Sequence, residues 1–292
     1  DVTSADAVFV CAWTSEHREL VARCVRADTA VFCEKPLGVD LADARAVAEL
    51  VEGVARPNMV GLVLRSSPAM LVARELLGGA LAPDGLGRVM SVVFRDDQFL
   101  PTQGLYGSSW RGDRSKAGSG VLLEHSIHDL DLIEWLLGPV VSVSALGTHV
   151  AGLEGIEDGV AATFRLADGG TVSLTSVWHQ VLSRPSQRRL EIFAERGMIT
   201  VEGDFEGPVV FTGPEPDATP QSFVGDELVT WLERRGVDTR SAETRFLAAL
   251  DGDDAPLDPG FAHALRAHEV AHATYVSMAA EGAAEVIPGR GH

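Results

Sequence analysis

Short apolar runs alternate with amphipathic segments along the first third of the chain. The runs at residues 7–11, 30–33 and 59–64 are continuously apolar, as expected of parallel strands that are buried on both faces. Helical spacing of apolar residues follows each run, and the potential N-caps of these helices are Thr14 or Ser15, Asp40 and Ser67. Strand and helix therefore alternate three times, which predicts part of a doubly wound α/β sheet.

From residue 88 the pattern changes. An alternating strand at 89–94 precedes a polar, glycine-rich loop at about 96–120 and then a helix at 121–137. Pairs of strands with short turns follow at 160–177 and 189–201, the first around an Asp-Gly turn. Consecutive strands with short connections predict an α+β domain with an antiparallel or mixed sheet.

The C-terminal part is expected to be helical, near 226–234 or 241–250 and at 260–280. A chain of 292 residues is long enough for two domains of ordinary size. We therefore expect the incomplete doubly wound domain at 1–87 and the α+β domain at 88–292.

Composition narrows the class of protein. The formal net charge of −18 argues against nucleic-acid and anionic-membrane partners, because phosphates require a basic surface. No stretch approaches the roughly 18 apolar residues of a membrane span, and no signal peptide is recognisable. Cys11, Cys24 and Cys33 are odd in number and lack a Cys-x-x-Cys pair, so reduced thiols in a cytoplasmic protein are expected.

The end of the second predicted strand carries unusual chemistry, in the tripeptide Glu34-Lys35-Pro36. The chain has only two lysines, Lys35 and Lys116, so a lysine at a strand end is conspicuous. Ligands of open α/β sheets bind outside the carboxyl ends of the strands, where an ammonium group can hold a substrate oxygen. A solvated salt bridge is the alternative interpretation of the tripeptide.

A second set of candidates lies on the predicted 121–137 helix. Glu124, His128, Asp131 and Trp135 are spaced i, i+4, i+7 and i+11 and would share one face. A histidine suits the base that removes a hydroxyl proton during oxidation, and a neighbouring carboxylate such as Glu124 would orient its ring or bind substrate. Asp131 would support this helix face. An ordinary solvated polar face is the alternative.

The dinucleotide fingerprint G-x-G-x-x-G is missing. Gly118-Ser119-Gly120 is followed by Leu123 where the third glycine should be, and Gly85-Leu86-Gly87 fails likewise at Met90. The sequence begins with Asp1, close to its first apolar run. We therefore expect the start of the doubly wound half to be absent, and this piece alone to bind a dinucleotide poorly.

Together, these motifs resemble the Gfo/Idh/MocA oxidoreductases. The resemblance rests on Glu34-Lys35-Pro36 after a strand and on the downstream pattern from Gly118 through Glu124 and His128 to Asp131. It extends to Trp110-Arg111 and covers nearly the whole chain. It implies a Rossmann domain that binds NAD or NADP, followed by a domain with an open-faced, mainly antiparallel sheet.

The resemblance also implies roles for individual residues. Lys35 and His128 would be catalytic, the Lys–Pro bond is often cis, and the acid at Glu124 is usually Asp. Trp13, Thr14, His17 and Glu34 are expected near the nicotinamide ribose, and Trp110 and Arg111 to close over the cofactor or to anchor their loop. The expected substrate-binding residues are Lys35, Glu124, His128, Tyr106 and His179.

The predicted function is that of an NAD(P)-dependent oxidoreductase acting on a secondary hydroxyl of a sugar, cyclitol or similar polyol. A homo-oligomer formed through the C-terminal sheet is expected. A non-catalytic cofactor- or sugar-binding paralogue and an NAD-dependent glycosidase are alternatives. A fourth, weaker alternative is a zinc metalloprotease, because residues 268–272 read His-Glu-Val-Ala-His, a literal H-E-x-x-H. Our preferred interpretation of that motif is packing of a closing helix, with no metal.

Overall fold

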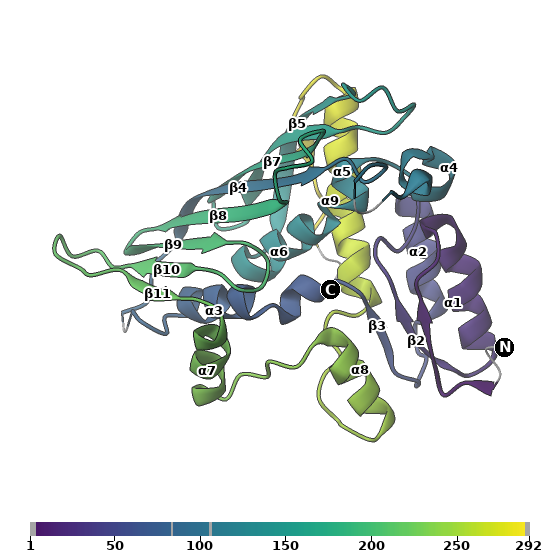
Figure 1. Ribbon diagram of the computed structural model, residues 1–292, viewed down its shortest axis with the longest axis horizontal. Coiled ribbons are helices and arrows are strands. Elements are labelled where there is room, and N and C mark those ends of the chain that lie inside the picture. Colours follow the sequence, from purple (N-terminus) through teal and green to yellow (C-terminus); the bar gives the residue numbers. More distant parts are fainter. Residues whose placement is uncertain (1–3, 83, 105–106, 290–292) are drawn as a thin grey trace.

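The computed structural model describes residues 4–82, 84–104 and 107–289, and it contains two sheets (Figure 1). The smaller sheet is parallel, in the order β1-β2-β3, with Val10, Cys33 and Val60 in register. Its strands are β1 (Ala7–Val10), β2 (Ala30–Cys33) and β3 (Asn58–Val60), and its helices α1 (His17–Arg26) and α2 (Leu41–Leu50), with the short helices η2 (Thr14–Glu16) and η3 (Val63–Ser66) at strand ends.

The expected alternation of strand and helix is confirmed, with two corrections. α1 begins at His17, directly after η2, and its N-cap position is Glu16 without a side-chain cap hydrogen bond, so neither Thr14 nor Ser15 caps it. The third strand ends at Val60 instead of residue 64, because the chain turns into η3 there. The predicted cap Asp40 accepts a hydrogen bond from the Asp43 amide at 2.8 Å. Ser67 likewise caps α3 (Pro68–Leu77) through the Met70 amide.

The C-terminal helices return to the smaller sheet. α8 (Ala242–Leu250) places Phe246 edge-on against Phe32 of β2, with ring centroids 5.6 Å apart, and α9 (Phe261–Ala279) packs on α2. α3, by contrast, packs into the core of the larger sheet. The core therefore does not follow the expected 1–87 and 88–292 division, because a parallel sheet needs apolar cover on both faces.

The larger sheet has nine strands in the order β11-β10-β9-β8-β4-β7-β6-β5-β12. β4 and β7 run parallel and every other neighbouring pair is antiparallel, as predicted for a mainly antiparallel sheet. The strands are β4 (Val89–Phe99), β5 (Val140–Thr148), β6 (Gly159–Leu166), β7 (Thr171–His179), β8 (Gln187–Ala194), β9 (Gly197–Glu202), β10 (Val209–Thr212), β11 (Gln221–Phe223) and β12 (Glu285–Val286).

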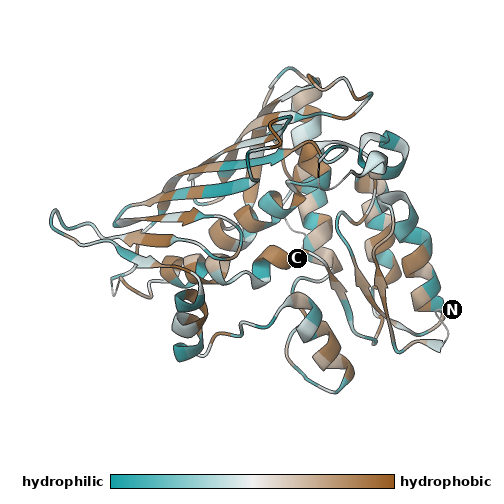
Figure 2. Ribbon diagram, viewed as in Figure 1, coloured by the Kyte–Doolittle hydropathy of each residue, from teal (hydrophilic) through white to brown (hydrophobic). Residues whose placement is uncertain are grey.

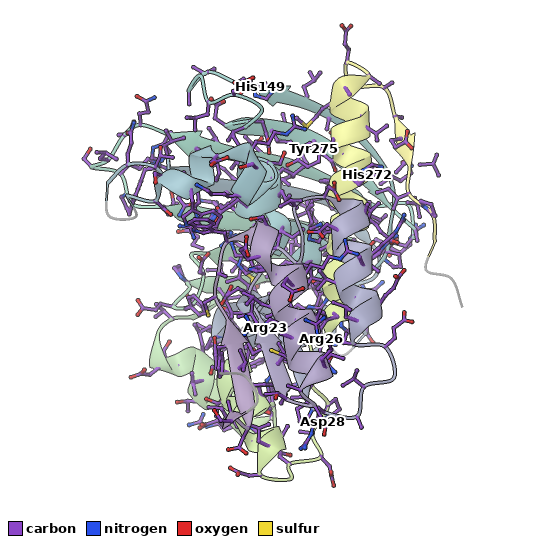
Figure 3. The ribbon with its side chains drawn as sticks, turned by 90° about the vertical axis from the view of Figure 1, so that its right-hand side faces the viewer. Arg23, Arg26, Asp28, His149, His272 and Tyr275 are labelled. Carbon is purple, nitrogen blue, oxygen red and sulfur yellow. The ribbon has the colours of Figure 1, made fainter. Side chains whose placement is uncertain are left out.

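Helices cover only one face of this sheet. α6 (Ile127–Leu137), α9 and α3 lie on that face, and α7 (Asp226–Arg234) packs on α3 (Figure 1). Polar and apolar residues alternate along the long strands, as Figure 2 shows, with the apolar set in the core. Seen from the side of the smaller sheet, His149 and His272 lie far from Asp28 (Figure 3). The part of the chain that the structure describes contains no helix able to span a membrane.

Two predicted boundaries in the second domain were wrong. β4 continues to Phe99 instead of ending at Phe94, so the long loop begins later and contains η4 (Ser109–Gly112) and α4 (Arg114–Ala117). The helix expected at 121–137 is broken into α5 (Val121–Glu124) and α6 by His125 and Ser126. The break rotates Glu124 relative to the residues of α6.

Candidate active site

The turn that carries Lys35 is fixed from two sides. Nδ1 of His17, on α1, donates a hydrogen bond to the Pro36 carbonyl at 2.9 Å. The Leu37 amide donates to Nε2 of His268, on α9, at 3.1 Å. Both histidines are buried, and burial lowers the pKa of each, that of His268 to about 3, so both rings are neutral. The Lys35–Pro36 bond within this turn is cis.

Lys35 reaches from β2 to the second domain. Its Nζ donates to the main-chain oxygen of Glu124 at 2.6 Å and lies 3.8 Å from Oε1 of the same residue. Nε of Arg111 donates to that Oε1 at 2.6 Å. Burial alone would raise the pKa of Glu124, but the charges of Lys35 and Arg111 outweigh it and lower the pKa. The carboxylate is therefore ionised between two cations.

His128 lies beside this pair as a neutral imidazole. Burial lowers the pKa of His128 well below its ordinary value, and the positive charges of Lys35 and Arg188 lower it further. Its Nδ1 is buried and has no hydrogen-bond partner among the residues described. Glu124 contacts Lys35 and Arg111, and no hydrogen bond joins it to His128. The expectation that Glu124 orients the imidazole is therefore not met. The break at His125 is the reason, because it takes the two residues out of i, i+4 register.

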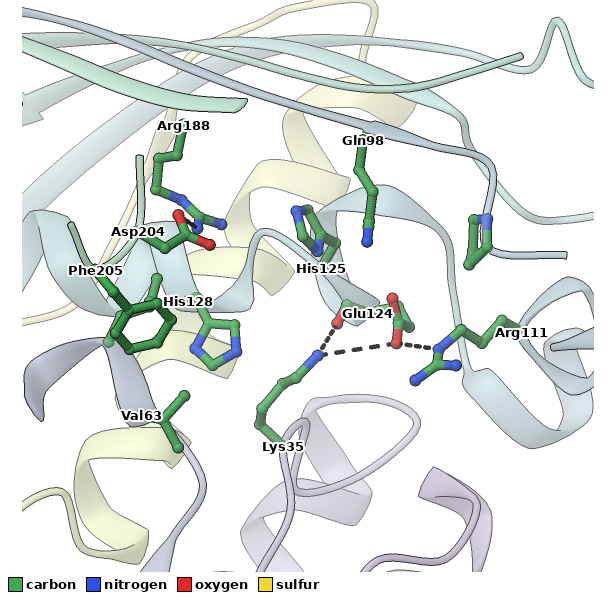
Figure 4. Close-up of a pocket in the computed structure, with 12 residues that line it drawn as sticks. Lys35, Val63, Gln98, Arg111, Glu124, His125, His128, Arg188, Asp204 and Phe205 are labelled. Carbon is green, nitrogen blue, oxygen red and sulfur yellow. Dashed lines mark hydrogen bonds and ion pairs between the residues drawn. The ribbon is translucent and has the colours of Figure 1, made fainter. Parts of the chain in front are cut away.

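These side chains enclose a cavity of about 230 Å³ between the two sheets (Figure 4). Lys35 enters it from the β2 turn, and His128 and Glu124 come from the α5–α6 segment. Its chemistry is mixed, with cations, two carboxylates, two imidazoles and a few apolar side chains. The lining residues are Lys35, Val63, Leu64, Gln98, Pro101, Arg111, Glu124, His125, His128, Arg188, Asp204 and Phe205.

A buried ionic cluster, which sequence reasoning missed, forms one wall. Arg188 of β8 donates to Asp129 through Nε at 2.6 Å and to Asp96 of β4 at 3.1 Å, and it also pairs with Asp204. Nε2 of His125 lies 3.0 Å from Oδ2 of Asp96. The sequence held only part of the signal: two aspartates directly continue an alternating strand pattern, but charged groups enter a core only when they are paired, and the partner is distant in sequence.

Asp131 supports its helix, as predicted, through a buried ion pair. Nε and a terminal nitrogen of Arg65 donate to the two Asp131 oxygens at 2.8 and 2.6 Å. Arg65 also donates to Asp258 at 2.7 Å and lies over the ring of Trp135. Because Arg65 is on η3, this pair joins the end of the smaller sheet to α6.

Two family models match this chain. Residues 1–62 match the model of an oxidoreductase family with an NAD-binding Rossmann fold, and residues 78–200 match the Gfo/Idh/MocA C-terminal domain. A myo-inositol dehydrogenase of Streptomyces leeuwenhoekii is 30% identical over 263 residues, which cover 87% of this chain and 72% of that protein. The chain belongs to the Gfo/Idh/MocA oxidoreductase family.

Other proteins are similar to this chain in sequence or in fold. A 1,5-anhydro-D-fructose reductase of Ensifer adhaerens is 33% identical over 84% of this chain and 64% of its own length. An inositol 2-dehydrogenase of Rhizobium meliloti is 28% identical over 68% of this chain and 57% of its own length. The chain thus spans less than two thirds of these two relatives. A levoglucosan dehydrogenase in complex with NADH has a TM-score of 0.80 at 20% identity, over 98% of this chain and 81% of that one.

The residues expected at the cofactor divide into two groups. Trp13 is 44% exposed at the end of β1, with Nζ of Lys116 4.5 Å from its ring centroid. Thr14 and His17 are buried, so they support the strand ends from inside instead of presenting side chains to a ligand. His17 does not face a ligand because its Nδ1 is hydrogen-bonded to the Pro36 carbonyl of the Lys35 turn.

Glu34 and the Trp110–Arg111 pair complete the expected cofactor set. The Glu34 carboxylate lies against Gly61, where an added Cβ would be 2.9 Å from Oε2, and burial raises the pKa of Glu34. The Arg111 guanidinium lies 4.7 Å from the Trp110 ring centroid. No glycine-rich turn follows β1 within the described part of the chain, so these residues do not provide a pyrophosphate site.

The expected substrate residues outside the cavity are placed differently. Tyr106 lies outside the described residues. His179, at the end of β7, accepts a hydrogen bond from the Val181 amide at 3.1 Å and lies 3.6 Å from Asp97. It is not among the residues that line the cavity, because Asp97 points to the other face of β4 from Gln98.

The H-E-x-x-H segment has a different role from the one its pattern suggests. Nε2 of His268 is engaged by the Leu37 amide, Glu269 pairs with Arg266 at 3.0 Å, and His272 is exposed. Over 4–82, 84–104 and 107–289, no group of three potential ligands is placed to hold a metal ion. The ring nitrogen Nε2 of His268 is thus occupied, and His268 positions the Lys35 turn.

Proposed function

We propose that this family member is an NAD(P)-dependent oxidoreductase, which transfers hydride between a nicotinamide cofactor and a secondary hydroxyl of a sugar, cyclitol or similar polyol. One observation carries the proposal: Lys35, which follows β2, meets Glu124 of α5 and His128 of α6 at a single cavity. The names of the relatives, which include inositol and levoglucosan dehydrogenases, support the substrate class.

The protonation states suit alcohol oxidation. A neutral His128 has a free lone pair and is able to accept the hydroxyl proton. The Lys35 ammonium would stabilise the oxygen as negative charge develops on it. Glu124 holds the ammonium in place through two oxygens, and Arg111 holds Glu124. Lys35 and His128 are thus the proposed catalytic residues, and Glu124 binds and positions Lys35.

NAD or NADP would supply the hydride acceptor. The residues that would hold its nicotinamide end are Trp13, Glu34 and Lys35 at the strand ends, with Trp110 and Arg111 from the long loop. The family model that matches residues 1–62 describes an NAD-binding fold, and relatives have been solved with NADH. The protein for the test should be expressed with whatever coding sequence precedes the codon for Asp1.

The test measures NAD(P)H formation with myo-inositol, levoglucosan and sugar alcohols as substrates. We expect turnover with at least one polyol, and a loss in kcat/KM of at least about a hundredfold in Lys35→Met and His128→Ala. His149→Ala is the matched control, since His149 is exposed and is not among the residues that line the cavity. Normal turnover in both site variants would refute the assigned roles. Cofactor binding without turnover would favour the non-catalytic paralogue, and sugar release without net NADH the glycosidase.

The uncovered face of the larger sheet supports a homo-oligomer. Val93, Leu146 and Phe193 are 46%, 59% and 37% exposed, on strands whose opposite faces are in the core. Apolar side chains on an open sheet face are typical of an interface. Light scattering on wild type and Val93→Lys tests this. A monomeric wild type would refute it.

A further inference from the structure

His125 occupies the break between α5 and α6, three residues before His128, and lines the same cavity. Figure 4 shows its ring between Gln98 and Arg188, above the tip of Lys35 in that view. Its Nε2 lies 3.0 and 3.2 Å from the two oxygens of Asp96, a buried residue of β4. The side chain of His125 is 17% exposed. The Asp96 carboxylate therefore holds the imidazole at Nε2, while part of the ring remains accessible from the cavity.

The partner on Nε2 decides which ring nitrogen carries the proton. Burial would raise the pKa of Asp96, but the charges of Arg188 and then His125 outweigh it and hold the pKa well below its usual range. An ionised carboxylate only accepts hydrogen bonds, so Nε2 of His125 carries the hydrogen. Nδ1 of His125 has no hydrogen-bond partner among the residues that the structure describes. A neutral ring offers an acceptor there and a protonated ring a donor, and a hydroxyl group can bond to either.

Gln98 provides an independent sign of a polar ligand at this wall. It is two residues after Asp96 on β4, so both side chains point to the same face of the sheet. Gln98 is 7% exposed and lines the cavity, and its Oε1 is buried without a hydrogen-bond partner. Buried polar atoms are normally paired, so this oxygen and Nδ1 of His125 together call for a ligand that carries hydroxyl groups.

We propose that Nδ1 of His125 hydrogen-bonds a substrate hydroxyl other than the one that is oxidised, which makes His125 a specificity-determining residue. The inference rests on the proposed function and assigns the residue that recognises a second hydroxyl of its substrate. Lys35 and His128 serve the reacting hydroxyl, while His125 and Gln98 require a second hydroxyl elsewhere on the same molecule. Asp96 is the positioning residue, because it fixes the ring and its tautomer. The substrate is then a polyol with at least two hydroxyls, and a simple secondary alcohol is a poor one.

The experiment compares each parent polyol with its monodeoxy analogues, in wild type and His125→Phe. Myo-inositol and 1,5-anhydro-D-glucitol are the parent probes. We expect wild type to prefer the parent over one monodeoxy analogue by at least about tenfold in kcat/KM. His125→Phe should lose at least about tenfold on the parent and less than about threefold on that analogue, so the preference disappears. Asp96→Asn should reduce the same preference by a smaller factor.

Equal losses on parent and analogue in His125→Phe, with an unchanged preference, would overturn the proposal. His272→Phe is the matched control, an exposed histidine on α9 outside the cavity (Figure 3), and it should keep the wild-type preference. Circular dichroism verifies that each variant is folded.

A wild type without any NAD(P)-linked turnover would refute the proposed function but not by itself the hydroxyl contact. The same pairs are then measured by titration calorimetry. A preference in Kd for the parent that His125→Phe abolishes supports the contact. The absence of binding by wild type, or of any preference, overturns it.

Discussion

His268 allows a sharp test of how the Lys35 turn is held, because its hydrogen bond requires a neutral ring. The Leu37 amide donates to Nε2, so protonation of Nε2 would place two donors against each other. Burial lowers the pKa of His268 to about 3, and the negative charge of Asp40, which acts in the opposite direction, does not offset this effect. The proposed perturbation is His268→Gln, which retains a hydrogen-bond acceptor and removes the titrating group.

The expected effect has a definite sign and size. An unfolded histidine titrates near pH 6.5, so between about pH 6.5 and 3 the unfolded chain binds one more proton than the folded chain at this site. Stability is therefore fully present above pH 6.5 and falls as the pH is lowered. From pH 7.5 to 5 the loss due to His268 alone amounts to about 2 kcal/mol of the free energy of unfolding. His17 and His128 act in the same direction, which makes the wild-type slope steeper still.

The assay is urea unfolding, followed by tryptophan fluorescence at pH 7.5 and 5. We expect His268→Gln to lose about 2 kcal/mol less than wild type over this interval. His272→Gln, at the other histidine of the same motif, serves as the control and should follow wild type, because its exposed ring makes no bond to the turn. If wild type and His268→Gln lose the same free energy of unfolding within about 0.5 kcal/mol, the assignment of His268 as a buried, neutral hydrogen-bond acceptor is wrong.

Two further predictions concern the contacts that join the parts of the molecule. Arg65→Met leaves the Asp131 carboxylate buried without its cation and should lower the free energy of unfolding by about 3–5 kcal/mol, whereas Arg26→Met, in an exposed pair, should cost at most about 0.5 kcal/mol. Equal urea midpoints for the two variants would contradict this. Phe246→Ala empties the aromatic contact between α8 and β2 and should cost about 3–5 kcal/mol by the same assay; a loss below about 1 kcal/mol would mean that α8 is not part of that core.

Much of the fold could be predicted from local pattern. The N-caps Asp40 and Ser67 and the parallel strands follow from signals within a few residues of each other, and all of these are confirmed. The return of α8 to the smaller sheet was not predictable, because nothing in its apolar spacing says which of two sheets it covers. The site shows the same division: Lys35 and His128 were recognised from motif spacing, whereas His125 had no assigned role beside them.

The missed parts of the site share a physical cause. Asp96 reads as the start of a loop because an isolated carboxylate would not enter a sheet, and only Arg188, 92 residues later, makes its burial acceptable. Similarly, His268 reads as a metal ligand until the Leu37 amide, 231 residues earlier, occupies its ring nitrogen. Each residue's role depends on a partner that no local window contains. The Lys35 turn is therefore held by the far end of the chain, and its geometry depends on how α9 packs.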